Sequence, residues 1–194
     1  RSRRPMRHAS KAGVVHVRDS VFSLVPVALV LFDVDETLMS TATLAEARHS
    51  KNPLDLTTLD SYANVRLHDG VADALIRIST TAAVGLVSSS ARWYVDQLIT
   101  DHLPGAEFSV TVTYDDVERI KPDPEPLLLA LRKTGYDTNQ AVYIGDADVD
   151  HAACVAAGIR FVGAGWVDCP TFPSTALSLA SPGDLLGLLE GVGK

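Results

Sequence analysis

The stretch LFDVDETL, residues 31–38, joins the end of an apolar run to three acidic residues, Asp33, Asp35 and Glu36. The run that ends here, residues 28–32, is short and wholly apolar, which is typical of a strand buried on both faces of a parallel sheet. In open α/β sheets, ligands bind at the carboxyl ends of the strands. The stretch therefore predicts a buried strand that ends at a polar, ligand-binding edge.

The rest of the chain repeats this pattern: short apolar runs alternate with segments whose apolar residues recur at spacings of three and four. The alternation predicts an α/β fold, a three-layer, Rossmann-like, doubly wound parallel sheet with helices on both faces. The expected strands are residues 28–32, 82–87, 108–112, 141–144 and 161–164. The expected helices are residues 71–79, 91–102, 125–134, 149–157 and 182–189.

One connection, residues 39–67, breaks the alternation because its length of about 30 residues exceeds that of an ordinary loop. Residues 43–49 are expected to form a short helix in it, and Asn52 and Pro53 to interrupt the pattern that follows. We interpret this segment as a small helical cap inserted into a core domain of residues 21–194. Residues 1–20 are expected to form a flexible basic arm.

Composition excludes several classes of protein. A chain of 194 residues, 46% hydrophobic, is most simply one domain. Its net charge of −7 disfavours nucleic acid and anionic membrane surfaces as partners. The basic residues before Asp19 and the apolar run of residues 21–32 resemble a secretory signal sequence. The run, however, continues into Asp33 and not into a small-residue cleavage site. With two cysteines, Cys154 and Cys169, outside any metal-binding spacing, we expect a soluble, cytoplasmic protein.

Polar residues follow several of the predicted strands. Asp33 and Asp35 follow the first, Ser88 and Ser89 the second, and Asp146 the fourth. Carboxylates gathered at one edge of a sheet would repel one another, so the fold should need a cation there. Because the ligands are oxygen atoms, Mg²⁺ is the expected ion, and its remaining positions suit waters or phosphate oxygens.

Four motifs, FDVDET, LVSSS, IKPDPEP and IGDADVD, resemble those of the haloacid dehalogenase superfamily of phosphohydrolases, in the expected order and over about residues 28–190. The stretches LHDGVADAL and SPGDLLGLL are similar to the phosphoglycolate phosphatase and β-phosphoglucomutase branch. That branch carries a large helical cap between the first two motifs, whereas this chain has only the short insertion. The resemblance thus implies a more open site, or one that another subunit covers.

The resemblance implies a Mg²⁺-dependent phosphatase that hydrolyses a phosphomonoester through an aspartyl-phosphate intermediate. Asp33 would be the nucleophile and Asp35 the general acid and base. The metal would be held by Asp33, the backbone carbonyl of Asp35 and Asp146. Ser88, Ser89 and Lys121 would bind the phosphoryl group, with a phosphorylated small molecule as the substrate and a larger one possible.

Other residues are expected to support the catalytic, metal-binding and phosphate-binding side chains. Asp150 lies one helical turn after Asp146 and is expected to orient the metal site or Lys121. Thr37 is expected to tie down the first loop, while Glu36 and Asp148 are interpreted as solvated. Five further residues have two interpretations each. His68 is a scattered histidine or one with a chemical role, and Arg92 is an exposed helix residue or a contact to a second anionic group. Trp93 and Tyr94 are core residues or residues that stack on a ligand, and Trp166 is a packing residue or part of the site mouth.

Other functions remain as alternatives. A phosphomutase of the same family would need a closing cap that excludes water, and the short insertion argues against it. A non-catalytic scaffold would keep the fold without the reaction, which the intact set of motif residues disfavours. A phosphoacceptor receiver domain would place its acidic pair before an acceptor Asp on a middle strand, and the order here does not fit.

Overall fold

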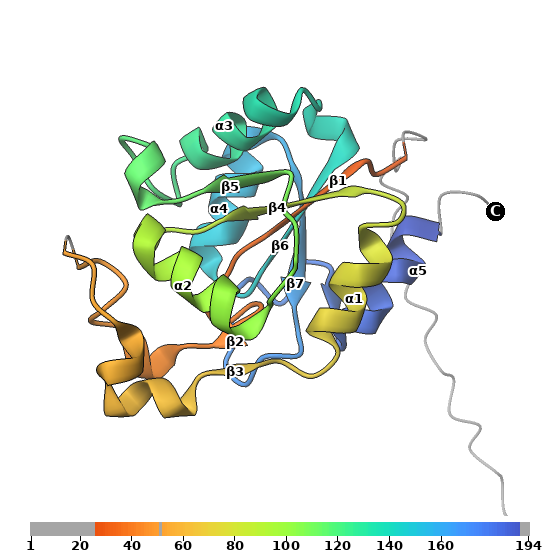
Figure 1. The fold of residues 1–194 in the computed structure, drawn as a ribbon. Coiled ribbons are helices and arrows are strands. Elements are labelled where there is room, and N and C mark those ends of the chain that lie inside the picture. The colour runs from red at the N-terminus through yellow and green to blue at the C-terminus, as the bar shows by residue number, and fades with distance from the viewer. Residues whose placement is uncertain (1–25, 51, 191–194) are drawn as a thin grey trace, which may run out of the picture.

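The computed structural model describes residues 26–50 and 52–190, so the predicted basic arm of residues 1–20 lies outside the described residues. Six parallel strands form one sheet in the order β5-β4-β1-β6-β7-β8, which places β1 near the centre (Figure 1). They are β1 (Leu29–Phe32), β4 (Ala83–Val87), β5 (Val110–Val112), β6 (Ala141–Gly145), β7 (Arg160–Ala164) and β8 (Ser178–Leu179). The predicted parallel α/β sheet is confirmed, and β8 is a short strand that the sequence pattern did not indicate.

Helices cover both faces of the sheet (Figure 1). They are α1 (Val71–Ile78), α2 (Arg92–His102), α3 (Glu125–Thr134), α4 (Asp148–Ala157) and α5 (Leu185–Glu190). Their bounds agree with the predicted helices to within one or two residues, except that the last one begins as a 3-10 turn, Pro182–Asp184. Left-handed Gly135 and Gly158 end α3 and α4, in the role that their positions predicted.

The core is divided by the sheet into two layers because successive side chains of a strand point to opposite faces. Val30 and Phe32 of β1 pack on the side of α1, α2 and the insertion. Leu29 and Leu31 pack on the other side, with α3 and α4. All four residues are at most 1% exposed, as a strand covered on both faces requires.

The insertion between β1 and α1 is a compact, irregular segment. Its ends pair as a two-stranded antiparallel sheet, β2 (Met39–Ser40) with β3 (Arg66–Leu67), and 3-10 helices lie at Ala42–Leu44, Leu56–Thr58 and Asp60–Asn64. The expected helix over residues 43–49 is wrong, because only one 3-10 turn forms there. Contacts with other segments draw this backbone out of a helix: the Ala91 amide donates to the Arg48 carbonyl, and the Thr43 hydroxyl donates to the Ser61 carbonyl.

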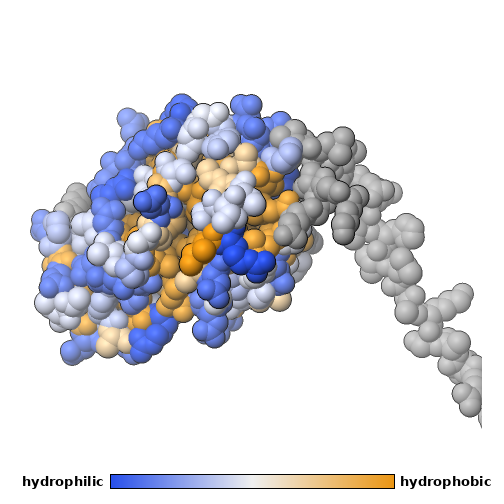
Figure 2. Space-filling view, turned by 45° about the vertical axis from the view of Figure 1, so that its right-hand side comes forward, coloured by the Kyte–Doolittle hydropathy of each residue, from blue (hydrophilic) through white to orange (hydrophobic). Residues whose placement is uncertain are grey.

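A hollow of about 680 Å³ lies at the opposite end of the sheet from the carboxyl ends of the strands. It is lined by α1, the start of β4 and the loop that leads into β5. Ile76 on its rim is 66% exposed. Figure 2 shows one face of the molecule, on which apolar side chains reach the surface among hydrophilic ones. Among the described residues, no helix combines the length and apolar character needed to cross a bilayer.

Candidate active site

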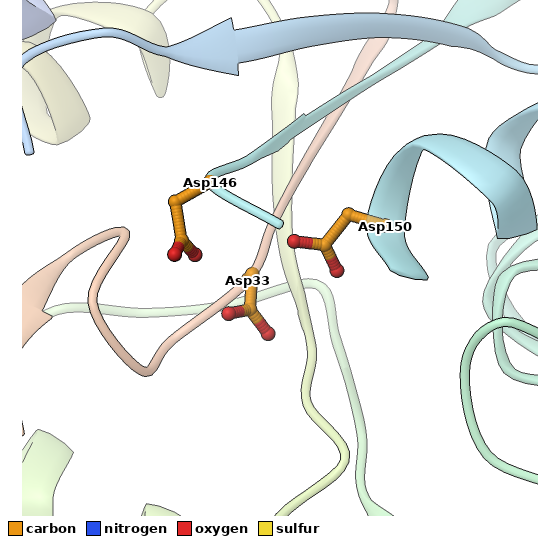
Figure 3. Close-up of side chains that lie close together, drawn as sticks. All are labelled: Asp33, Asp146 and Asp150. Atoms are coloured by element: carbon orange, nitrogen blue, oxygen red, sulfur yellow. The ribbon is translucent and has the colours of Figure 1, made fainter. Parts of the chain in front are cut away.

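Three acidic side chains meet at the carboxyl edge of the sheet (Figure 3). Asp33 directly follows β1, Asp146 directly follows β6, and Asp150 projects from the first turn of α4. Strands β1 and β6 are neighbours in register, so the two residues that follow them are brought side by side. Each of the three acids offers an oxygen atom, and these oxygens all lie within 4.8 Å of one another.

The cluster carries an excess of negative charge. Burial, opposed by Lys121, raises the pKa of Asp33 well above its ordinary value, and the neighbouring carboxylates raise it further. Burial and the charge of Asp150 likewise raise the pKa of Asp146, to about 6. The oxygen-only donor set and this repulsion fit a hard divalent cation, since a bound cation would relieve both effects.

Lys121 supplies the positive charge of the site. Its Nζ lies 2.6 Å from Asp33 Oδ1 and 2.7 Å from Asp150 Oδ1, and it donates to the Tyr143 hydroxyl at 2.7 Å. Burial favours the neutral amine, but the charges of Asp150 and Asp33 outweigh it and raise the pKa of Lys121. The side chain is 3% exposed, so this ammonium is a fixed charge. It faces the carboxylate that the motif pattern assigns as nucleophile.

The loop that carries Asp146 depends on its glycine. Gly145 ends β6, and a Cβ atom built there would collide with the carboxylate of Asp150. That carboxylate accepts a hydrogen bond from the Ala147 amide at 3.1 Å and closes the first turn of α4. The chain can therefore place Asp150 against Lys121 only because residue 145 has no side chain.

Asp35 lies in a separate polar pocket beside the acid cluster. Its Oδ1 accepts hydrogen bonds from Thr41 Oγ1 at 2.7 Å and from the Tyr94 hydroxyl at 2.8 Å, and Oδ2 accepts one from Ser90 Oγ at 2.6 Å. Arg48 Nε lies 3.1 Å from Oδ1. Because these contacts engage both oxygens and Asp35 is not among the three acids whose oxygens converge, Asp35 would contribute to a metal site through its backbone carbonyl.

The two serines predicted to bind phosphate follow β4. Ser88 is 2% exposed, and its Oγ accepts a hydrogen bond from the Ser90 amide at 3.0 Å, which tightens the loop. Ser89 is half-buried in the same loop. Since β4 is the neighbour of β1 on the side away from β6, the loop lies beside Asp33.

The first loop, residues 33–41, is fixed by side chains from distant segments. Thr37 Oγ1 donates to Asp146 Oδ1 at 2.9 Å, and the Trp166 indole donates to the Thr37 carbonyl at 3.0 Å. Glu36 adopts a left-handed φ of 60°, and its carbonyl lies 2.7 Å from His68 Nε2. Trp166 and His68 thus hold the backbone of the loop.

The two acids interpreted as solvated are the more accessible ones. Asp148 is exposed at the start of α4. The Glu36 side chain is 32% exposed, against 10% for Asp33 and 9% for Asp35, and it also accepts a hydrogen bond from the Thr41 amide at 2.8 Å. Arg92 forms an ion pair with Asp116 and donates to the Thr111 carbonyl, which ties α2 to β5. The Trp93 indole donates to the Ser50 carbonyl at 2.9 Å and thereby joins α2 to the insertion.

Five residues contact the motif acids through side chains that the sequence did not assign to this role: Thr41, Arg48, Ser90, Tyr94 and Tyr143. Ser90 is the third serine of LVSSS, and Tyr143 is a tyrosine in an otherwise apolar buried strand, where its hydroxyl needs a polar partner. Both carried a local signal. Arg48 and Tyr94 reach Asp35 only through packing of the insertion and α2, which no local pattern encodes.

Comparison with known proteins bears on this arrangement. The family model described as haloacid dehalogenase-like hydrolase matches residues 54–164, which is more than half of the chain. The chain belongs to the haloacid dehalogenase-like hydrolase family. The matched range includes Ser88, Lys121, Asp146 and Asp150, while the FDVDET motif precedes it.

Among curated relatives, pyrophosphatase PpaX of Bacillus velezensis is 39% identical over 83 residues, 43% of this chain and 38% of that protein. Phosphoglycolate phosphatase of Salmonella choleraesuis is 36% identical over 94 residues, 48% of this chain and 37% of that protein. The alignments thus span less than two fifths of the length of these relatives. They support the family and leave the activity of the whole chain to be proposed.

Solved structures of the family share the fold. A Lactobacillus plantarum protein, solved as a candidate phosphoglycolate phosphatase, superposes with a TM-score of 0.68 at 24% identity, over 84% of this chain and 99% of that one. CbbY of Rhodobacter sphaeroides, in complex with phosphate, gives 0.65 at 20% identity, over 84% and 99% of the two chains. At these identities the likeness shows that the chain has the Rossmann-like fold of the family.

Proposed function

We propose that this protein is a Mg²⁺-dependent phosphatase that hydrolyses a phosphomonoester through an aspartyl-phosphate on Asp33. The observation that carries the proposal is the position of Asp33. Its carboxylate follows the central strand, contacts the Lys121 ammonium and lies beside two further acids, Asp146 and Asp150. An oxygen nucleophile that contacts a fixed cation and lies in a carboxylate cluster able to hold a metal suits attack on an anionic phosphoryl group.

In the first step, an oxygen of Asp33 forms a bond to phosphorus. The bond from phosphorus to the leaving oxygen breaks, and its electron pair stays on that oxygen. Asp35 in its protonated form gives its proton to the same oxygen, so the alcohol leaves neutral. Lys121 and Ser88 hold the phosphoryl oxygens, and Lys121 also balances the negative charge that the acyl phosphate retains.

In the second step, water attacks the phosphorus of the aspartyl-phosphate. Asp35, now ionised, takes a proton from that water, and the bond between phosphorus and the Asp33 oxygen breaks with its electrons returning to the carboxylate. Inorganic phosphate is released and Asp33 is regenerated. Asp35 thus returns to its protonated form, ready for the next substrate.

Asp33 and Asp146, with the backbone carbonyl of Asp35, would hold the metal, and Asp150 would orient the site from beside Lys121. A bound Mg²⁺ supplies positive charge that offsets the repulsion between carboxylate and phosphate and polarises the phosphoryl group. Thr37, which donates to Asp146, keeps that acid at the edge of the sheet.

For the substrate we propose a small phosphorylated molecule. The curated relatives are named for pyrophosphate and phosphoglycolate, so these two compounds are the first candidates for testing. The insertion at residues 39–67 is short and packs against α2 through Trp93, and we propose that it acts as a reduced cap. A cap of this size leaves room for larger phosphorylated substrates as well. A cytoplasmic location is proposed on the low cysteine content.

The test measures release of phosphate from p-nitrophenyl phosphate, pyrophosphate and phosphoglycolate by the purified chain, with and without Mg²⁺. Wild type should turn over at least one substrate only with the metal, and Asp33→Asn should be inactive. Asp148→Asn, an exposed acid on α4, is the matched control and should retain activity. A radiolabelled phosphoryl group should also bind covalently to wild type in a hydroxylamine-sensitive form and not to Asp33→Asn. Absence of metal-dependent turnover would favour the scaffold alternative.

A further inference from the structure

The carboxylate of Asp35 is surrounded by side chains from three parts of the chain. Thr41 and Arg48 belong to the insertion, Ser90 to the loop after β4, and Tyr94 to α2. Asp35 is 7% exposed, and both of its oxygens are in contact with these partners. Its orientation is therefore set mainly by residues outside its own loop, Arg48, Ser90 and Tyr94, and half of the four partners come from the insertion.

Arg48 is the cationic member of this group. Its Nε lies 3.1 Å from Asp35 Oδ1, within ion-pair distance, yet the N–H is buried without an aligned hydrogen bond. Its Nη2 donates to Thr41 Oγ1 at 3.1 Å, and Thr41 in turn donates to Asp35. Arg48 thus acts on Asp35 twice, once through charge and once through Thr41.

The backbone of Arg48 is anchored more firmly than its side chain. The Arg48 carbonyl accepts from the Ala91 amide at 2.8 Å, directly before α2, which fixes the start of the side chain. The side chain itself is 22% exposed, and besides the hydrogen bond to Thr41 its guanidinium makes an unaligned contact with Asp35 and a 3.5 Å approach to Glu36. A group held in this way can orient a carboxylate without locking it.

We propose that Arg48 and Tyr94 are positioning residues for Asp35: they orient its carboxylate for proton transfer to the leaving oxygen, and through Arg48 the insertion takes part in the reaction. The inference rests on the proposed function, because it concerns the step in which Asp35 gives its proton to the alcohol that leaves. Neither residue needs to touch the substrate. The insertion would thereby affect the rate as well as access to the site.

The leaving group of the substrate provides the test. A p-nitrophenolate leaves readily without a proton, whereas the alkoxide of phosphoglycolate or glycerol phosphate is a poor leaving group and depends on the acid. General acid catalysis contributes about 10²–10⁴-fold to such steps. Arg48→Met, which keeps the length and removes the charge, should therefore lower kcat/KM for the alkyl ester by about 10-fold or more, and kcat/KM for the aryl ester by less than about 3-fold. The ratio kcat/KM is compared because it covers the steps up to the aspartyl-phosphate, whereas kcat also includes its hydrolysis, which needs Asp35 with either substrate.

Three variants complete the design. Tyr94→Phe removes only the hydroxyl that contacts Asp35. It should shift the ratio of alkyl-ester to aryl-ester activity in the same direction as Arg48→Met. Asp35→Asn sets the largest ratio that loss of the acid can produce. Arg92→Met is the matched control, because Arg92 also joins α2 to a neighbouring segment through an ion pair but, within the described part of the chain, forms no hydrogen bond or ion pair with Asp35. It should leave the ratio unchanged.

A purely structural role would lower both activities equally, together with the melting temperature, so equal losses in Arg48→Met and Tyr94→Phe would overturn the proposal. An unchanged ratio in both variants would overturn it as well. If Arg48→Met does not fold, the milder Tyr94→Phe decides. Turnover by wild type and its loss in Asp33→Asn test the proposed function separately, so failure of the positioning role is distinguishable from failure of the phosphatase assignment.

Discussion

The ammonium of Lys121 lies 2.6 Å from Oδ1 of Asp33, and both side chains are at most 10% exposed. The loop after β5 and the end of β1 are thereby joined at the centre of the site. Asp150 makes a second contact with the same ammonium at 2.7 Å, so one lysine neutralises part of the charge of two acids. Such an arrangement depends on each of its members, because removing one leaves a buried charge without a partner.

Replacing Lys121 with methionine should therefore abolish turnover and destabilise the metal-free protein. Removal of one partner from a buried ion pair costs about 3–5 kcal/mol, because the remaining charges stay buried. Chemical denaturation of Lys121→Met and wild type without metal measures this loss. Lys133→Met is the control, since the exposed Lys133 pairs at the surface with Asp116 and should change the free energy of unfolding by less than about 1 kcal/mol. Equal stability of the two variants would contradict the prediction.

Stabilisation by Mg²⁺ should increase with pH around the pKa of Asp146. Burial and Asp150 raise this pKa from 3.8 to about 6, so folding without metal favours the protonated form, and the resulting stability is lost as pH rises through about 6. Mg²⁺ binds the ionised form of Asp146, so metal binding restores the stability that ionisation of the buried acid removes. The increase in melting temperature caused by Mg²⁺ should thus be small near pH ~5 and large near pH ~7.5. A metal-induced increase that is the same at both pH values would contradict a site built on Asp146.

The order and type of the main elements followed from the sequence because their causes are local. Apolar runs such as residues 141–144 can only be buried strands in this alternation, and the glycines at 135 and 158 mark helix ends. The insertion was less predictable. Its 3-10 turns and the contact of Arg48 with α2 come from tertiary packing, which overrides the weak helical pattern of residues 43–49.

For the candidate site, spacing and residue type identified the acids that meet, since parallel strands place their ends at one edge. Asp33, Asp146 and Asp150 lie together as that reasoning requires. The hydroxyl groups around them were not predictable from spacing. Tyr94 contacts Asp35 although the two residues are 59 positions apart in the sequence, and the position of Tyr94 depends on how α2 packs over β1. Whether these residues have the proposed roles is decided by the variants described above and below.

Tyr143→Phe should lower kcat with little effect on KM. The Tyr143 hydroxyl accepts from Lys121 Nζ at 2.7 Å and donates to the Val87 carbonyl at 3.0 Å, so its removal takes one hydrogen bond from the buried ammonium, which keeps Asp33, Asp150 and the Val87 carbonyl as partners. Stability should fall by about 1.5–3 kcal/mol, the contribution of a hydrogen bond to a charged group. Steady-state kinetics and denaturation check both effects. Tyr136→Phe, the same change at a half-buried position of α3's C-terminal end, should leave kcat unchanged; an equal loss there would show that the effect is general.

Gly145→Ala should disturb Asp150 and, through it, Lys121. A methyl group at residue 145 would occupy the space of the Asp150 carboxylate, which would have to move away from the Lys121 ammonium and the Ala147 amide. Overpacking of this kind costs about 1–3 kcal/mol, and the displaced acid should lower both kcat and the stabilisation by Mg²⁺. Gly187→Ala in α5 is the control, because no described atom beyond its own helix backbone and chain neighbours lies within 4 Å of the position its Cβ would take, and it should be neutral or stabilising by up to about 1 kcal/mol. Denaturation, turnover and metal-dependent melting of the two variants check the prediction, and full activity of Gly145→Ala would show that the position of Asp150 is not required.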